Sequence, residues 1–231
     1  MSATPVLQRE TDQSSSESSS FELSLRDIPL PIILRPAQPL SDEDLLAFCA
    51  ANRGMEIESD ADGSITIMTP AGPDSSRLNQ YLAAELTLWS RQAGGIVFGP
   101  DLGIRFPDKT MRGPDVAWLS APRWNALSPG QRKVFLSFCP EFILELRSES
   151  DRASTVEAKM EFWLSRGAEL GWLIDPRRKL AMIYRPGQEP ATLLQPEILE
   201  GEGPITGFRL EMHHFWEYGI SSTLRNIGVP A

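Results

Sequence analysis

The order in which helical and strand-like hydrophobic patterns follow one another restricts the fold of this chain more than any other feature. Leu78, Leu82, Leu86 and Trp89 recur at helical spacing, whereas the apolar runs that follow are short and bounded by turn residues. The expected order is a helix, a hairpin, a helix, several strands, another helix and further strands. This order predicts an α/β (α+β) fold, in which helices flank a mixed β-sheet.

Local signals give the bounds of these elements. Ser41 is expected to cap the first helix, because acidic residues fill the turn that follows it. A hairpin is expected at Glu56–Met68 around the turn Asp60–Gly63. The second helix, Ser76–Arg91, is expected to end at Gly94. The remaining elements are a helix at Ser154–Arg166 and strands at Ile96–Phe98, Gly103–Phe106, Asp115–Leu119, Glu141–Leu146, Gly171–Ile174 and Ala181–Tyr184.

The two ends of the chain differ from this patterned region. Residues 12–20 read DQSSSESSS, a polar low-complexity run, and prolines punctuate residues 29–39. We therefore predict a tail at 1–36, a single domain at 37–218 and a second tail at 219–231.

Composition points to the cytoplasm. The two cysteines, Cys49 and Cys139, form no CxxC pair and are expected to be reduced thiols in the core. No apolar run reaches the roughly 20 residues that span a bilayer, and no hydrophobic stretch near Met1 resembles a secretory signal. The net charge of −9 argues against tight, sequence-independent binding of nucleic acid.

Three carboxylates have unusual neighbours. Asp115 stands at the mouth of an apolar strand, and strand alternation puts Glu145 on the same face as Ile143, in or beside the core. Glu58 closes the first strand of the hairpin. Each could be an ordinary strand-end acid with a salt bridge, but a buried carboxylate is costly unless it is paired or binds a metal. Together the three suggest a site for Mg²⁺ or Mn²⁺; the adjacent pair His213 and His214 has no zinc-ligand spacing.

A lysine on the third helix is the remaining candidate. Lys159 falls on the flank of the apolar stripe formed by Met160 and Trp163, so its stem could follow the core and present the ammonium at the edge of the sheet. It is either a boundary lysine without a role or a cation that orients water and offsets charge on a phosphate. Asn79, Arg77 and Gln80, on the preceding helix, could face the cleft in which these acids and Lys159 would lie.

This ordered set of residues resembles the PD-(D/E)XK nuclease superfamily and, more narrowly, the Uma-two family of bacterial restriction endonucleases. The matching stretches are IESDADGSITIMTP (57–70), RGPDVAWLS (112–120), CPEFILELRSESD (139–151), EAKMEFWLSRGAELGWLIDP (157–176) and IYRPGQE (183–189). The resemblance covers roughly residues 41–217.

The resemblance implies a restriction-endonuclease-like fold and a Mg²⁺-dependent endonuclease that acts on DNA, with Mn²⁺ as an alternative ion. Asp115, Glu145 and Glu58 would be both catalytic residues and metal ligands. The usual lysine two residues after the glutamate is Arg147 here, which stays protonated and would instead clamp a phosphate of the substrate. Lys159 would then supply the catalytic ammonium. Nucleases of this type often pair, so a homodimer is expected as well.

Two other functions remain open from the residues alone. One is a binding or regulatory module that has kept the fold and lost the chemistry, which the acidic charge and Arg147 favour. The other is an enzyme whose paired carboxylates perform acid–base chemistry on a sugar or another small molecule. Metal-dependent nicking of plasmid DNA distinguishes the nuclease from both.

Overall fold

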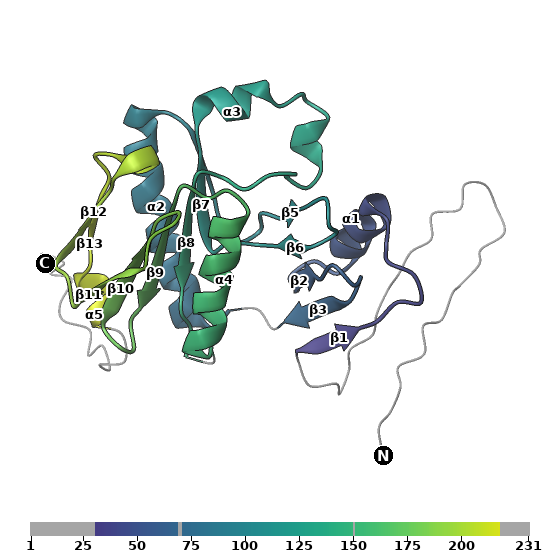
Figure 1. The fold of residues 1–231 in the computed structure, drawn as a ribbon, viewed down its shortest axis with the longest axis horizontal. Helices are drawn as coiled ribbons and strands as arrows, with labels where there is room; N and C mark the ends of the chain where they lie inside the picture. The colour runs from purple at the N-terminus through teal and green to yellow at the C-terminus, as the bar shows by residue number, and fades with distance from the viewer. Residues whose placement is uncertain (1–30, 69–70, 150, 218–231) are drawn as a thin grey trace, which may run out of the picture. The chain divides into compact units, whose positions relative to one another are not determined.

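The structure, a computed structural model, describes residues 31–68, 71–149 and 151–217. These residues divide into two compact units that interleave along the sequence. Of the described residues, unit 1 comprises 31–68, 103–113 and 129–137, and unit 2 comprises the others. Because the chain passes between the units repeatedly, neither is a separate stretch of sequence. Figure 1 draws the elements of both.

Unit 1 contains one helix and a five-stranded sheet in the order β1-β3-β2-β6-β5. The predicted hairpin is confirmed: β2 and β3 pair antiparallel on either side of the turn, and Glu58 lies opposite Thr66. Leu45 and Phe48 of the helix pack with Ile67 of the sheet to form a small core. The elements are β1 (Ile32–Leu34), α1 (Asp42–Ala51), β2 (Glu56–Ser59), β3 (Ile65–Met68), β5 (Ile104–Arg105), β6 (Met111–Arg112) and a 3-10 turn at Gln131–Lys133.

The strand β1 falls inside the range 1–36 that the sequence predicts as a tail. Its three residues pair antiparallel with β3, from Ile32 opposite Ile67 to Leu34 opposite Ile65. The hydrogen bonds of the hairpin edge stabilise this segment, a tertiary contribution that low local complexity does not reveal. Residues 1–30, and the predicted C-terminal tail at 219–231, lie outside the described residues.

Unit 2 is built on a six-stranded sheet in the order β11-β10-β9-β8-β7-β4. Neighbouring strands pair antiparallel except β8 and β9, which are parallel and are joined by the helix α4. A second, two-stranded sheet pairs β12 with β13. The elements are α2 (Pro73–Ala93), β4 (Ile96–Phe98), β7 (Val116–Leu119), α3 (Ala121–Ala126), β8 (Phe142–Leu146), α4 (Ala153–Ser165), β9 (Leu170–Asp175), β10 (Leu180–Tyr184), β11 (Ala191–Leu194), β12 (Ile198–Glu200), a 3-10 turn at Gly203–Ile205, β13 (Arg209–Glu211) and α5 (His213–Trp216).

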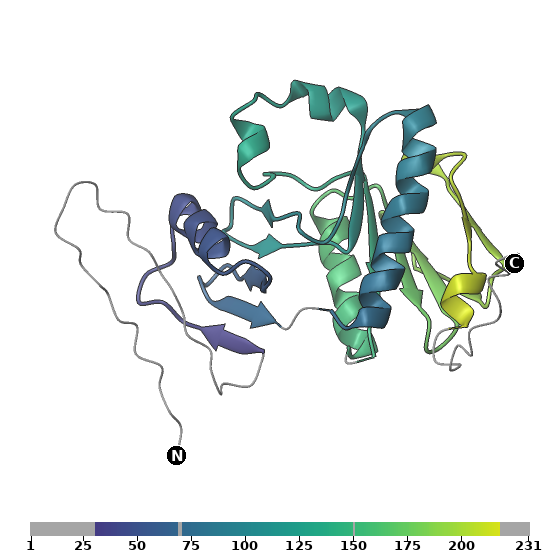
Figure 2. The same cartoon turned by 180° about the vertical axis from the view of Figure 1, so that it is seen from behind.

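The helices α2 and α4 cover opposite faces of the six-stranded sheet (Figures 1 and 2). Side chains alternate between the two faces along β8. Leu144 and Leu146 join the main core, to which α2 contributes Leu78 and Leu82. The intervening Glu145 therefore belongs to the other face, which α4 covers.

The predicted fold class is confirmed, and most differences concern the bounds of elements. The second helix begins at Pro73 and not at Ser76, because proline is well suited to the first helical position. Asp115 directly precedes β7 and is not its first residue. The short helix α3 was not expected from the sequence. Within the described ranges, no helix is both long and apolar enough to cross a membrane.

Candidate active site

Asp115 stands where β7 begins, and three elements converge on its carboxyl group. Its Oδ1 accepts a hydrogen bond from Nδ2 of Asn79 on α2 at 3.0 Å. Its Oδ2 accepts one from the backbone N–H of Leu146 on β8 at 2.7 Å. The side chain is thus fixed between the helix on one face of the sheet and the end of the neighbouring strand.

Glu145 is opposite Asp115 in the register of the two strands. The last residue pair of β7 and β8 is Val116 with Leu144, so the next positions along the two antiparallel strands are Asp115 and Glu145. Glu145 is only 2% exposed, in a strand whose other residues are apolar and buried. The sequence expectation that this carboxylate enters the core is therefore confirmed.

Two side chains of α4 reach the buried carboxylate of Glu145. Trp163 donates its indole Nε1–H to Oε1 at 2.7 Å. The ammonium Nζ of Lys159 lies 3.2 Å from Oε2. Lys159 and Trp163 are four residues apart and hence lie on the same side of the helix, one turn from each other. The parallel crossover β8-α4-β9 places this side of α4 against the sheet face that carries Glu145.

The electrostatics link the two acids and the lysine. Burial, with a smaller contribution from the nearby charge of Asp115, raises the pKa of Glu145 to about 8, against the opposing effect of Lys159. Burial also raises the pKa of Asp115, although Lys159, the Leu146 N–H and Asn79 act in the opposite direction. One ammonium therefore interacts with two carboxyl groups that are reluctant to carry two negative charges together.

Arg147 is held by protein groups. Its Nη1 donates to Oδ2 of Asp175 at 2.7 Å, and its Nε and Nη2 donate to the backbone oxygen of Asp151. Asp175 is fully buried and is also paired with Arg178. These bonds fix the loop after β8, so Arg147 has a clear positioning role. A contact between Arg147 and a substrate phosphate stays a prediction.

Glu58 belongs to unit 1, whereas Asp115, Glu145 and Lys159 belong to unit 2. In its own unit, Glu58 places Oε2 3.3 Å from Nε of Arg112, which is also paired with Asp60. Among the described residues, no group of three or more His, Cys, Asp or Glu side chains is arranged to hold a metal ion. The three-carboxylate set that includes Glu58 stays a prediction.

The oxygen donors of unit 2 fit a hard cation. Mg²⁺ is usually held by one or two protein carboxylates and keeps several waters, so Asp115 and Glu145 form a sufficient pair. A further oxygen lies beside them, since Oδ1 of Asn79 is buried and has no hydrogen-bond partner in the described structure. Carboxylate and amide oxygens are the ligands that Mg²⁺ and Mn²⁺ prefer.

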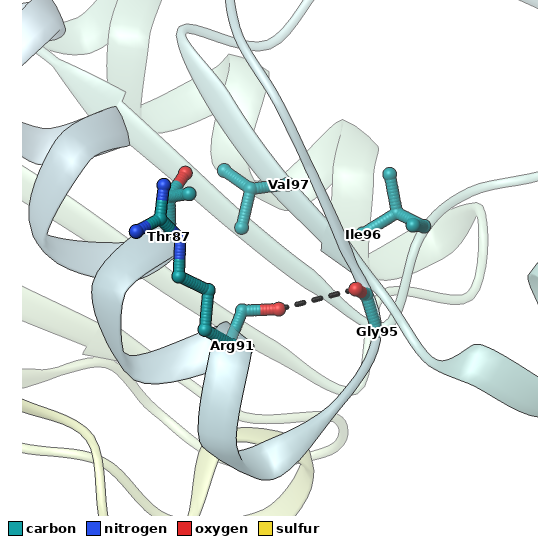
Figure 3. Close-up of a pocket in the computed structure, with 6 residues that line it drawn as sticks. Thr87, Arg91, Gly95, Ile96 and Val97 are labelled. Atoms are coloured by element: carbon teal, nitrogen blue, oxygen red, sulfur yellow. Dashed lines mark hydrogen bonds between the residues drawn. The ribbon is translucent and has the colours of Figure 1, made fainter.

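A hollow of about 200 Å³ lies elsewhere in unit 2. Figure 3 shows Thr87 and Arg91 on one side, from the end of α2, and Gly95, Ile96 and Val97 on the other. The predicted site residues are not among those that line it. Its position at the edge strand β4 gives it no link to the carboxylate pair.

Two residues of the site were not predicted from the sequence to be functional. Trp163 was assigned only to the apolar stripe of α4, although its spacing of four residues from Lys159 indicates that both side chains face the same target. Asp175, the partner of Arg147, ends an apolar strand much as Glu145 does, and that pattern could have revealed it. Asn79, a candidate from the sequence, does contact Asp115.

Comparisons with known proteins indicate the family and the fold of this chain. The model of the Uma2 family, described as "Putative restriction endonuclease", matches residues 42–213. Among solved structures, the chain is similar to a crystal structure from Anabaena variabilis described as "a putative nuclease", with 20% identity and a TM-score of 0.57. The match covers 70% of this chain and 89% of that one, and it supports the restriction-endonuclease-like fold. No curated protein matches the sequence.

Proposed function

Because this chain belongs to the Uma2 family of restriction endonucleases, we propose that it is a Mg²⁺-dependent endonuclease that hydrolyses phosphodiester bonds in DNA. The observation that carries this proposal is the convergence of Asp115, Glu145 and Lys159 from two strand ends and a helix. In this proposal the two carboxylates would bind a cation, and the ammonium would interact with an anionic substrate. Mn²⁺ would serve as an alternative ion.

Asp115 and Glu145 would hold the ion in this proposal. Mg²⁺ at that position supplies Lewis-acid polarisation of a phosphate and makes water more acidic. Asn79 and the Leu146 N–H keep the Asp115 carboxylate oriented, and Trp163 does the same for Glu145. Such fixed carboxylates lose little entropy when the reacting groups assemble.

Lys159 would act on the substrate itself. Hydrolysis joins a water oxygen to phosphorus and breaks one phosphorus–oxygen ester bond, while negative charge builds on the phosphate. An ammonium held in a partly buried site stabilises that charge and orients the attacking water. Its side chain is 24% exposed, which leaves it open to a ligand while its stem is packed. Arg147 is proposed as a contact for a phosphate of the substrate.

The net charge of the protein affects how tightly it would bind DNA. With 22 basic and 31 acidic residues, the chain lacks the excess of cations that gives tight nonspecific binding. We therefore expect weak association with DNA, in which bound cations offset the negative charge of the carboxylates. A homodimer would bring two such sites to the two strands of a duplex.

Plasmid nicking tests the proposal. Supercoiled DNA is incubated with the protein in Mg²⁺, Mn²⁺ or EDTA, and Asp115→Asn is compared with Glu161→Gln, which changes an exposed acid on α4. We expect cutting in either ion, none in EDTA, and a loss of at least about 100-fold only in Asp115→Asn. A folded protein that neither nicks DNA nor binds Mn²⁺ in calorimetry would support the binding module instead.

A further inference from the structure

The two polar atoms of the Asn79 side chain differ in their hydrogen bonding. Asn79 is 8% exposed and lies on α2, directly after Leu78 of the apolar stripe that packs on the sheet. Its amide nitrogen donates to Asp115 at 3.0 Å. Its amide oxygen is buried, and no hydrogen-bond donor of the described structure reaches it.

A buried carbonyl oxygen without a partner is costly. It forfeits its hydrogen bonds to water and gains none in return. A leucine at position 79 would fill the same space without this penalty. The position instead carries a polar side chain whose nitrogen is used and whose oxygen is left available next to Asp115.

The chemistry of that oxygen indicates its partner. A carbonyl oxygen is an acceptor only, so it can bind a hydrogen-bond donor or a cation. Lys159, the cation of the site, interacts with Glu145 and with Asp115. An amide oxygen is a regular ligand of hard divalent cations, and it adds a donor without adding a third negative charge.

We propose that Asn79 is a ligand of the divalent cation held by Asp115, with its side-chain oxygen as the coordinating atom. This inference rests on the proposed function, because it assumes that the cation binds at Asp115 and Glu145. It goes further in assigning a neutral oxygen from α2 to the coordination shell. The site would then draw on both faces of the sheet, α2 through Asn79 and β8 through Glu145.

Mn²⁺ binding by calorimetry and by the electron paramagnetic resonance of free Mn²⁺ tests this assignment without relying on activity. Three variants of the full chain are compared: Asn79→Leu removes both polar atoms, Asn79→Asp keeps an oxygen and loses the amide donor, and Gln92→Leu alters an exposed amide on the same helix. Thermal unfolding in EDTA monitors the fold of each variant.

We expect Asn79→Leu to raise the Kd for Mn²⁺ about tenfold or more, and Asn79→Asp to keep or lower it. Gln92→Leu should leave the Kd for Mn²⁺ unchanged. If Asn79 served only to orient Asp115 through its amide, Asn79→Asp would weaken binding as much as Asn79→Leu, and the assignment would be wrong. Unchanged binding in Asn79→Leu would also overturn it while leaving the proposed function intact. Failure of the unmodified protein to bind Mn²⁺ would overturn both.

Discussion

Lys159 on α4 places its Nζ 3.2 Å from Oε2 of Glu145 on β8, so the ammonium reaches the carboxylate from a helix and not from the strand itself. The strand position two residues after Glu145 holds Arg147, whose guanidinium is directed to Asp175. The site thus combines a lysine that approaches the acids with an arginine that fixes the loop beside them.

The first prediction concerns the charge of Lys159. Lys159→Met keeps the length of the side chain and removes the ammonium, so phosphate charge in the transition state loses its stabilising cation. We expect nicking to fall by at least about 100-fold, while Lys159→Arg retains part of it. Initial rates on supercoiled plasmid measure this. Lys133→Met, which alters an exposed lysine of unit 1, serves as the control. Full activity of Lys159→Met would exclude a catalytic role.

The second prediction is a decline in stability with rising pH. Burial raises the pKa of Glu145 to about 8, above the ordinary value of 4.5. Between these values the folded protein holds a proton that the unfolded chain has lost, so the free energy of unfolding falls as pH rises from about 5 to about 8. Asp115, whose pKa is also raised by burial, contributes in the same direction.

Urea denaturation at pH 5.5 and pH 9 measures this decline. Glu145→Gln removes the titrating group. The difference in the free energy of unfolding between the two pH values should therefore be smaller in this variant than in the unmodified protein, by on the order of 2 kcal/mol. Glu161→Gln, on the exposed side of α4, should leave the pH dependence as it is. Parallel curves for the unmodified protein and Glu145→Gln would contradict the buried carboxyl as the cause.

The third prediction separates the two arginines that pair with Asp175. Burial by itself would raise the pKa of Asp175, but hydrogen bonds from the Arg178 backbone and from both guanidinium groups lower it. The side chain of Arg147 is 11% exposed and that of Arg178 is 41% exposed. Arg147→Met should cost on the order of 2 kcal/mol, because it removes the more buried partner of a buried carboxylate.

Arg178→Met is the matched control for Arg147→Met. Because the guanidinium of Arg178 is largely exposed, water screens its interaction with Asp175, and we expect this variant to lose no more than about 1 kcal/mol. Midpoints of urea unfolding compare the two. An equal loss in both variants would mean that Arg147 does not anchor the loop after β8.

The fourth prediction tests the packing at the start of β4. Gly94 and Gly95 have φ of 88° and 91°, which alanine tolerates poorly. A methyl group on Gly95 would lie 2.5 Å from the indole of Trp118, whereas one on Gly94 would meet nothing within 4 Å. Gly94→Ala therefore reports backbone strain alone. We expect Gly95→Ala to lower the free energy of unfolding by at least about 1 kcal/mol more, and equal losses would contradict this packing.

Local signals in the sequence predicted much of the fold. Ser41 does cap α1, with its hydroxyl accepting from the N–H of Asp44, and the hairpin turn lies where Asp60–Gly63 indicated. These features depend on neighbours in the chain. The strand β1 and the short helix α3 were missed, because the first depends on pairing with β3 and the second spans only six residues.

The burial of Glu145 was predicted for the right reason, whereas some contacts of the two acids were not predicted. Glu145 stood out because a carboxylate interrupts an apolar strand, and it is indeed buried. Its bond to Trp163 and the bond of Asp115 to the Leu146 N–H depend on the register of β7 with β8 and on the docking of α4. Neither spacing nor alternation specifies such contacts between distant elements.

The pairing of Lys159 with Glu145 has a consequence for how the protein is handled. The fold carries its own counter-ion, so the sheet can close around a buried acid without any ion from solution. A small zinc domain, by contrast, unfolds when its metal is chelated. Purification and storage in EDTA should therefore yield folded material that needs only the divalent ion to be restored.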